Sequence, residues 1–386
     1  MNDRKLATEI IDESPIDANI PNMSRNLEGD GERREVRSVQ HLSELLAVDW
    51  PAIRSAEGKA SDRKAELHAL VEPYVTSDAS FVVFGSVARM EVTSQSDLDW
   101  ILLVDGQADP AHTEMAQELA EVIAQAGFKE PGKEATFGAV VPSHDLIQNI
   151  GGEEDSSVNT TRRLLLLLES TPIGRPDAHQ RTVNNVLNRY VREDYGLVHG
   201  TVGPKIPRFL QNDVVRYWRT LCVDFAYKRR ARGDQGWALR TAKLRMSRKL
   251  IYVAGLLMCY ACALDPEIAT LDSATGHDAA PDIVEFFLKM VGQTPLERVA
   301  CILGASPAHD NALRDIFCAY DEFLSMLDNN DTRAQLESLT RTTVSTDATY
   351  HAVRTLSDRF EEALLRILVD DPSSEFFKLT RKLAVF

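Results

Sequence analysis

Apolar residues early in the chain recur with the period of a helix and then give way to a strand-like run. Between Val39 and Tyr74 they fall mostly three or four positions apart, at Leu42, Leu45, Leu46, Ile53, Leu67, Leu70 and Val71. This spacing predicts helices with one buried face. The run SFVVFG at residues 80–85 is continuously apolar, β-rich and ended by glycine. We therefore expect a buried strand there.

A second strand and a further helix are predicted downstream. The segment DLDWILLVDG at residues 97–106 alternates at first and then becomes wholly apolar, as a central strand that ends at a glycine turn does. Residues 111–127 have helical spacing and end at Gly127. Residues 135–149 are expected to hold another strand, and GGEED at residues 151–155 a loop.

From Arg162 onward the apolar spacing is helical nearly to the end of the chain. Helices are expected over residues 162–170, 180–195, 210–232, 237–264, 281–292, 296–304, 308–328 and 349–369. The pattern predicts an α+β fold, with a mixed-sheet module followed by an all-helical module. The expected divisions are a flexible polar arm over residues 1–38, the mixed module over residues 39–200 and the helical module over residues 201–386.

Composition restricts the class of protein. With 386 residues, 44% hydrophobic and 26% charged, the chain excludes collagen, a coiled-coil rod and wholesale disorder. The apolar run from Leu250 to Leu264 is shorter than the ~20 residues that a membrane span needs, so a buried helix and no membrane partner are expected. An acidic N-terminus without an apolar core and only five cysteines favour a cytoplasmic location.

Charge is distributed unevenly along the chain. The net charge of −15 argues against a general nucleic-acid coat protein. Between Lys205 and Lys249, however, 13 Lys and Arg residues face three acids, a net of +10, which leaves −25 for the rest. This basic segment indicates either a local anion site or a solvated helix face.

The segment FGSVARMEVTSQSDLDW at residues 84–100 carries the candidate chemistry. Asp97 and Asp99 stand two positions apart at the start of a predicted strand, so their carboxylates share one face, roughly 6–7 Å apart. Such a pair can hold two Mg²⁺ ions together with phosphate oxygens and water. Gly85 allows close approach of the backbone, and the Ser86 hydroxyl and the following N–H groups can hold a phosphate.

The alternative is that these acids are ordinary surface residues on a capped turn. Asp97 and Asp99 directly precede the apolar run Trp100 to Leu103. Two carboxylates that enter a buried strand are costly unless they bind cations. The metal-binding interpretation is therefore favoured.

The segment resembles the signature of the DNA polymerase β-like nucleotidyltransferase superfamily, in which an apolar residue, Gly and Gly or Ser precede Asp-apolar-Asp-apolar. The resemblance implies a polymerase β-like mixed-sheet domain with a helical partner, two Mg²⁺ ions on Asp97 and Asp99, and triphosphate binding by Gly85 and Ser86. Among its members, the PII-protein uridylyltransferase group is most similar. Its Gly-Gly-x-x-Arg-x-Glu and Ser-Asp-x-Asp pattern and its leucine-rich helix are matched by Arg89, Glu91, Ser96 and residues 162–175.

The same resemblance extends the candidate site. A third carboxylate that helps to activate the attacking hydroxyl is expected, with Asp145 as first candidate and Glu134 as second. A helical domain of this superfamily often supplies cations to the triphosphate. The predicted nucleotide-binding cations are Arg89, Arg216, Arg219, Lys243 and Arg245. Tyr217, Trp218 and Trp237 could stack on a base, although packing in a core is the more usual role of such aromatics.

The resemblance implies an enzyme that moves a nucleoside monophosphate from an NTP or dNTP to an acceptor hydroxyl and releases pyrophosphate. The acceptor is open between a protein side chain, a nucleotide and an oligonucleotide, and a partner protein from the same operon is also open. Ser86 replaces the second Gly of the uridylyltransferases, and their hydrolase and sensor domains have no counterpart here, so modification of PII is not expected. A second-messenger synthase of bacterial antiphage defence or a tRNA-modifying toxin fits the two-module layout. A catalytically inert nucleotide-binding scaffold is the alternative of another class.

Overall fold

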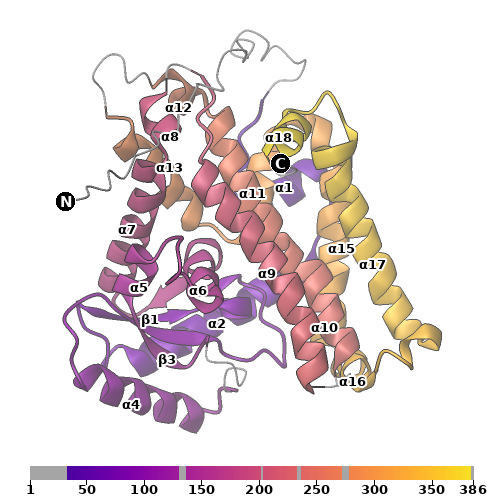
Figure 1. Ribbon diagram of the computed structural model, residues 1–386. Helices are drawn as coiled ribbons and strands as arrows, with labels where there is room; N and C mark the ends of the chain where they lie inside the picture. Colours follow the sequence, from indigo (N-terminus) through magenta and orange to yellow (C-terminus); the bar gives the residue numbers. More distant parts are fainter. Residues whose placement is uncertain (1–32, 130–135, 201–202, 233–235, 272–277, 384–386) are drawn as a thin grey trace, which may run out of the picture. The chain divides into compact units, whose positions relative to one another are not determined.

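A small mixed sheet lies at the centre of the first part of the chain (Figure 1). The computed structural model describes residues 33–129, 136–200, 203–232, 236–271 and 278–383. In the sheet, of order β3-β2-β1-β4, β1 pairs antiparallel with both β2 and β4, and β2 pairs parallel with β3. The strands are β1 (Ala79–Val83), β2 (Trp100–Val104), β3 (Ala139–Pro142) and β4 (Thr171–Ile173).

Helices cover both faces of this sheet, so its two central strands are buried along their whole length. Phe81 and Leu102 pack on one side with residues of α2 and α4. Val82 and Ile101 point the other way, into a cluster with α6 and α7. This arrangement explains why both strands are continuously apolar. The helices that accompany the sheet are α2 (Pro51–Val71), α3 (Gly85–Ala88), α4 (Ala111–Gln125), α5 (Ser143–Gln148), α6 (Ser157–Leu168) and α7 (Asp177–Glu193).

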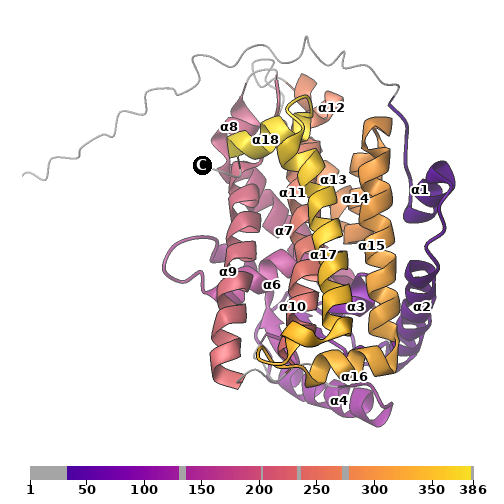
Figure 2. The same ribbon diagram turned by 90° about the vertical axis from the view of Figure 1, so that its right-hand side faces the viewer.

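The described residues after α7 are helical. Figure 2 shows α9, α11, α15 and α17 running side by side, with α1 and α2 beside α15. These elements are α1 (Val39–Leu46), α8 (Tyr195–His199), α9 (Arg208–Arg232), α10 (Trp237–Lys243), the π-helix η2 (Leu244–Arg248), α11 (Lys249–Leu264), α12 (Pro266–Thr270), α13 (Ala280–Val291), α14 (Pro295–Gly304), η4 (Pro307–His309), α15 (Asp310–Asp328), α16 (Asn330–Ser338), η5 (Val344–Thr346), α17 (Ala348–Leu365), η6 (Arg366–Asp370) and α18 (Glu375–Leu383).

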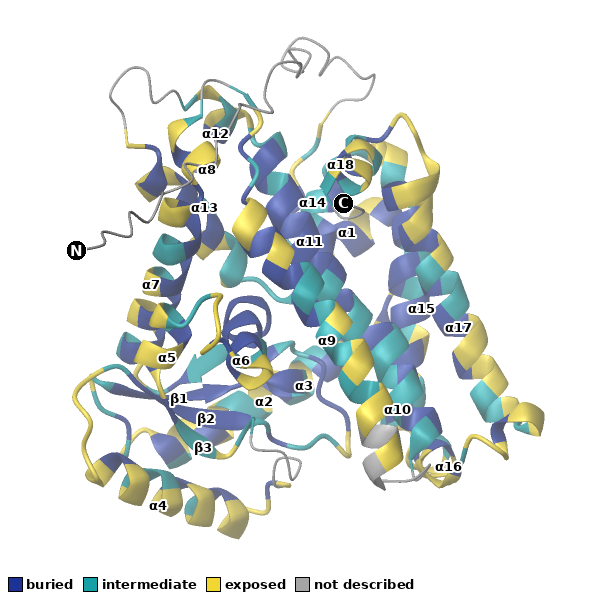
Figure 3. Ribbon diagram, in the orientation of Figure 1, coloured by how far each residue is buried: buried dark blue, intermediate teal, exposed yellow. Residues whose placement is uncertain are grey.

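Helix α11 is buried on nearly every side (Figure 3). One side, with Leu257, joins the core of the helical bundle, and the other, with Met258, packs against the helices of the sheet. The continuous stretch Trp237–Leu264 is long and apolar enough to cross a membrane by length and composition, but 72% of its most apolar window is buried inside the protein. Its hydrophobicity is therefore accounted for by two packing surfaces.

The structure confirms the predicted α+β class, with a mixed sheet and a helical region. Strand β3 confirms the strand expected within residues 135–149, and α5 follows it. Asp97 and Asp99 precede β2 and do not lie on it, and helices α16 and α18 were not predicted. The short strand β4 was not predicted.

The predicted domain boundaries stay a prediction. Residues 1–32 of the expected N-terminal arm lie outside the described residues. The described residues belong to one compact unit, Gly31–Phe386. Helices α1 and α2, from the first predicted module, pack on α14 and α15 of the second.

Candidate active site

The turn after β1 brings the backbone of Gly85 against Asp99. Gly85 has a φ of +64°, and a Cβ placed on it would lie 3.0 Å from Oδ2 of Asp99. The N–H of Phe84 donates to the carbonyl oxygen of Asp99 over 2.9 Å. Glycine is required here both by the left-handed backbone and by the close approach. The predicted Gly-Ser turn and the predicted acidic pair are therefore direct neighbours.

Asp97 and Asp99 form an uncompensated acidic pair. Both line a cavity of about 640 Å³. Desolvation by the surrounding protein, followed by the charges of Asp97 and Glu169, raises the pKa of Asp99 to about 7. Within the described part of the chain, no side chain donates a hydrogen bond to either carboxylate or forms an ion pair with it. An acidic pair in this state calls for a cation.

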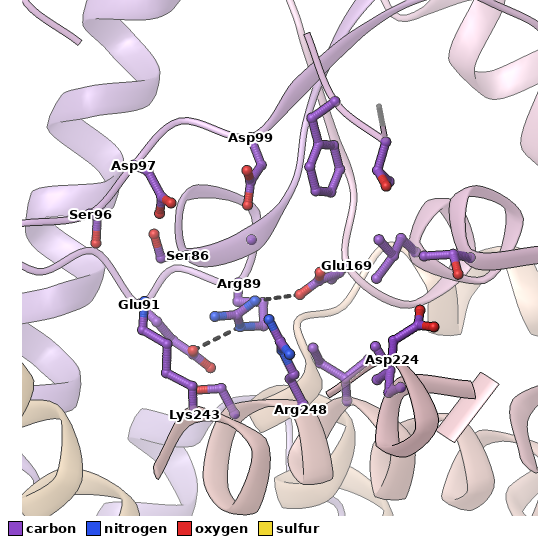
Figure 4. A pocket seen from close by; sticks show the side chains of 18 of the residues that line it. Ser86, Arg89, Glu91, Ser96, Asp97, Asp99, Glu169, Asp224, Lys243 and Arg248 are labelled. Carbon is purple, nitrogen blue, oxygen red and sulfur yellow. Dashed lines mark hydrogen bonds and ion pairs between the residues drawn. The ribbon is translucent and has the colours of Figure 1, made fainter. Parts of the chain in front are cut away.

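The cavity lies between the sheet module and the helices that follow it (Figure 4). One wall comes from the turn after β1 and the segment before β2, and the opposite wall from α9, α10, η2 and α16. Its volume is in the range of small-molecule sites. The polar and charged residues that line it include Ser86, Arg89, Glu91, Ser96, Asp97, Asp99, Ser157, Thr161, Glu169, Asp224, Lys243, Arg248 and Arg333.

Arg89 lies at the wall of the cavity but is held by two carboxylates. Its Nε bonds to Glu91 over 2.8 Å and its Nη1 to Glu169 over 2.5 Å. Glu91 and Glu169 are 3% and 7% exposed, and burial raises the pKa of Glu91. A guanidinium that compensates two buried carboxylates has little capacity left for a phosphate. The geometry therefore favours Arg89 as a positioning residue.

Lys243 and Arg248 bring positive charge to the cavity from the helical region. Burial lowers the pKa of Lys243 to about 8, although the charge of Asp97 partly opposes this shift. Among the described residues, neither side chain has an ion-pair or hydrogen-bond partner. Their cationic groups are available to an anion that enters the cavity between them and the acidic pair.

Of the aromatic residues predicted for base stacking, Tyr217 lines the cavity and Trp218 and Trp237 do not; the remaining predicted residues that the structure describes lie elsewhere. Asp145 is exposed on α5, beside His144, and Glu134 falls outside the described residues. Arg216 pairs with Asp155 and Asp213. Two more of the predicted cations lie elsewhere: Arg245 pairs with Asp358 and Glu361, and Arg219 lies on the exposed face of α9.

Among the charged residues of the cavity, Glu169, Asp224, Arg248 and Arg333 were not predicted as site residues. Glu169 ends α6, and a carboxylate directly after five leucines was a usable signal. Arg248 and Asp224 come from the basic segment, but nothing in the local pattern distinguishes them from their neighbours. Helix α9, which carries Asp224, packs on α6 and α7, and η2, which carries Arg248, contacts α10, α11 and α17, so their presence in the cavity depends on tertiary packing.

The donor set was tested for magnesium. The described residues contain no group of three or more His, Cys, Asp or Glu side chains arranged to hold a metal ion. Among the described residues, Asp97 and Asp99 are two neighbouring carboxylates of the cavity without a hydrogen-bond or ion-pair partner. Mg²⁺ is commonly held by one or two carboxylates, with substrate phosphates and water as its other ligands. The pair therefore fits Mg²⁺ when a triphosphate is bound.

Comparison with known proteins agrees with this chemistry. Residues 58–138 match the model of a family described as "Putative nucleotidyltransferase DUF294". The matched stretch contains Gly85, Ser86, Asp97 and Asp99, and it ends before Glu169 and Lys243. No curated protein matches the chain. In the residues that carry its acidic pair, the chain is thus similar to nucleotidyltransferases, and its fold fits an α+β nucleotidyltransferase domain joined to a helical domain.

Proposed function

We propose that this protein is a Mg²⁺-dependent nucleotidyltransferase that moves a nucleoside monophosphate from an NTP or dNTP to an acceptor hydroxyl and releases pyrophosphate. The observation that carries the proposal is the contact between the Gly85 turn and Asp99, with Asp97 beside it. This contact supports the proposal, because the Gly85 turn would hold phosphates beside two carboxylates that have no cationic partner among the described residues. The family match over residues 58–138 supports the same reaction class.

In this proposal the two walls of the cavity have different functions in nucleotide binding. The Gly85 backbone and the Ser86 hydroxyl bind the triphosphate, and Lys243 and Arg248 offset its charge from the opposite wall. Asp97 and Asp99 hold Mg²⁺, which supplies positive charge beside the phosphates. Catalysis by such a site consists mainly of positioning and charge neutralisation.

The proton of the attacking hydroxyl needs an acceptor. Burial and the charges of Asp97 and Glu169 raise the pKa of Asp99 to about 7, and its carboxylate contacts the Gly85 turn. Glu169 also lines the cavity but is paired with Arg89. Asp145, the expected third carboxylate, is exposed outside the cavity. In this proposal the attacking hydroxyl therefore lies beside Asp97 and Asp99, and the carboxylate of Asp99 accepts its proton while pyrophosphate leaves.

The acceptor stays open between a protein side chain, a nucleotide and an oligonucleotide. Arg219 and Arg230 are exposed on α9, the helix that also contributes Tyr227 to the cavity lining, and neither has a partner among the described residues. An exposed cationic face at this place suits an acceptor that carries phosphates. Antiphage signalling, the cytoplasm as location and the likeness to uridylyltransferases remain predictions.

The test is incubation of the purified protein with each α-labelled NTP and dNTP and Mg²⁺. An Asp97→Ala/Asp99→Ala variant removes the acidic pair, and Asp370→Asn, at an exposed position of η6, is the matched control. Products are separated on denaturing gels and by thin-layer chromatography. Label in a protein, nucleotide or oligonucleotide that is lost only in the double variant supports the proposal. Binding of nucleotide without any transfer, with and without cell extract as acceptor source, would instead indicate an inert scaffold.

A further inference from the structure

The cavity continues beyond the acidic pair to an end of different chemistry. Along α9 the cavity is lined by Leu221, Asp224 and Tyr227, and its other lining residues include Phe137 and Val158 together with Thr136, Ser157 and Thr161. In Figure 4, Asp224 lies on the far side of Glu169 from Asp97. The carboxylate of Asp224 therefore lies apart from the acidic pair, in a cavity whose lining also includes apolar, aromatic and hydroxyl-bearing residues.

Asp224 has no partner in this setting. It is half-buried, and among the described residues no side chain or backbone N–H bonds to its carboxylate. Leu221 and Tyr227, three positions to either side of it on α9, also line the cavity. For a carboxylate partly removed from water, binding of a ligand is favourable when the hydrogen-bond donors of the ligand replace the lost water. Only donors complement it, because an ionised carboxylate accepts hydrogen bonds and donates none.

We propose that Asp224 recognises the base of the incoming nucleotide and selects guanine. The inference rests on the proposed function, because it takes the triphosphate to lie at the Asp97–Asp99 end. Guanine presents N1–H and the 2-amino group side by side, which matches the two oxygens of one carboxylate. Adenine and cytosine present one amino group next to a ring acceptor, and the N3–H of uracil lies between two carbonyl oxygens. Both arrangements place an acceptor against a carboxylate oxygen.

The walls of this end suit a planar base. Phe137 and Tyr227 both line the cavity, and the ring centroid of Phe137 lies 5.4 Å from that of Phe84, which anchors it to the sheet. Aromatic side chains stack on bases without regard to their identity. Stacking would therefore supply affinity, and Asp224 would supply the choice between bases.

The test measures binding without turnover. The α,β-methylene analogues of GTP, ITP, ATP, CTP and UTP cannot be cleaved at the bond that nucleotidyl transfer breaks, and each is titrated into the full chain with Mg²⁺ by calorimetry. The wild type is expected to bind the GTP analogue roughly tenfold or more tightly than the UTP analogue. Inosine lacks only the 2-amino group of guanosine. The guanine-over-hypoxanthine preference of the wild type should disappear in Asp224→Asn and persist in the control Asp370→Asn.

Each outcome separates this inference from the proposed function. Equal binding of all five analogues, or a preference that Asp224→Asn leaves unchanged, overturns the guanine assignment while nucleotidyl transfer stands. Failure of every analogue to bind in Mg²⁺ overturns both. Simultaneous binding of GMP and the GTP analogue, with only GMP sensitive to Asp224→Asn, would move the base to the acceptor and contradict the proposal.

Discussion

The backbone N–H of Ser94 donates a hydrogen bond to Oδ1 of Asp328 over 2.9 Å, and so joins the loop before Asp97 to the end of α15. The hydroxyl of Ser94 adds a bond to the Asp328 carbonyl oxygen over 3.2 Å, and Lys59 pairs with the other carboxylate oxygen. The helical region therefore holds the segment that carries the acidic pair.

We expect Asp328→Ala to release this loop. Loss of the hydrogen bond should lower the free energy of unfolding by about 1 kcal/mol. A larger effect, about tenfold, is expected on kcat/KM for the nucleotide, because small displacements of reacting groups are costly. Asp328→Asn is the matched variant, since it keeps an oxygen for Ser94 and removes only the charge that faces Lys59. If both variants lose activity equally, the Lys59 pair and not the Ser94 bond positions the loop.

The acidic pair should make the metal-free protein less stable. The pKa of Asp99 is about 7 in the folded protein and 3.8 in the reference state, so between these values the folded protein binds more protons than the unfolded one. The contribution of this group to stability therefore falls as pH rises from about 4 to 7. With a chelator at pH 8, Asp99→Asn should be more stable than the wild type by about 2 kcal/mol.

Urea unfolding with and without Mg²⁺ checks this prediction. The difference between Asp99→Asn and the wild type should shrink as the pH is lowered to 4. Added Mg²⁺ should stabilise the wild type and have little effect on Asp99→Asn. A variant that is less stable than the wild type at pH 8 in chelator would show that Asp99 already has a compensating partner.

Arg89 should be needed for folding more than for nucleotide affinity. Arg89→Met leaves Glu91 and Glu169 buried without a counter-charge, which should cost about 3–5 kcal/mol of stability. Arg89→Lys keeps a charge but not the two-sided geometry, so a smaller loss is expected. Thermal unfolding measures both, with the exposed Arg219→Met as control. A raised KM with unchanged stability in Arg89→Lys would return Arg89 to the phosphate-binding role expected from the sequence.

Short-range patterns in the sequence were sufficient to predict the central strands and the motif. Buried β1 and β2 are continuously apolar, and the Gly85 turn and Asp99 are joined by a short connection. Strand β4 was missed because it has only three residues and because Pro172 in its middle argues against a strand, although Thr171 and Ile173 are β-branched. Only the elements with a clear local pattern could therefore be predicted from the sequence.

The far wall of the cavity depends on packing that no local pattern encodes. Lys243 and Arg245 stand two positions apart in the same basic segment, yet Lys243 lines the cavity and Arg245 pairs with Asp358 on α17. On a helix, positions two apart point in nearly opposite directions, and the π-helix η2 shifts the phase again at Leu244–Arg248. Which cation faces the acids is settled only when α10 and η2 dock.

Lys243 is expected to destabilise the nucleotide-free protein and to strengthen nucleotide binding. Burial holds its pKa near 8, Asp97 raises it, and the nearby charges of Arg333, Arg248 and Arg89 lower it. Lys243→Met replaces an unpaired buried cation with an apolar side chain of similar length, so the nucleotide-free protein should become more stable. Loss of a charged hydrogen-bond donor should weaken binding of a non-cleavable nucleotide analogue by roughly tenfold or more at pH 7.

The pH dependence of binding separates this role from simple packing. Because Lys243 loses its proton as pH rises through about 8, wild-type affinity for a non-cleavable nucleotide analogue should fall between pH 7 and pH 9. Lys243→Met should bind weakly and without that decline, since Arg248 stays charged throughout this range. Calorimetric titration at three pH values, with urea unfolding of both proteins, measures the two effects together. Equal declines in wild type and variant would assign the titration to another group at the cavity and remove Lys243 from the phosphate site.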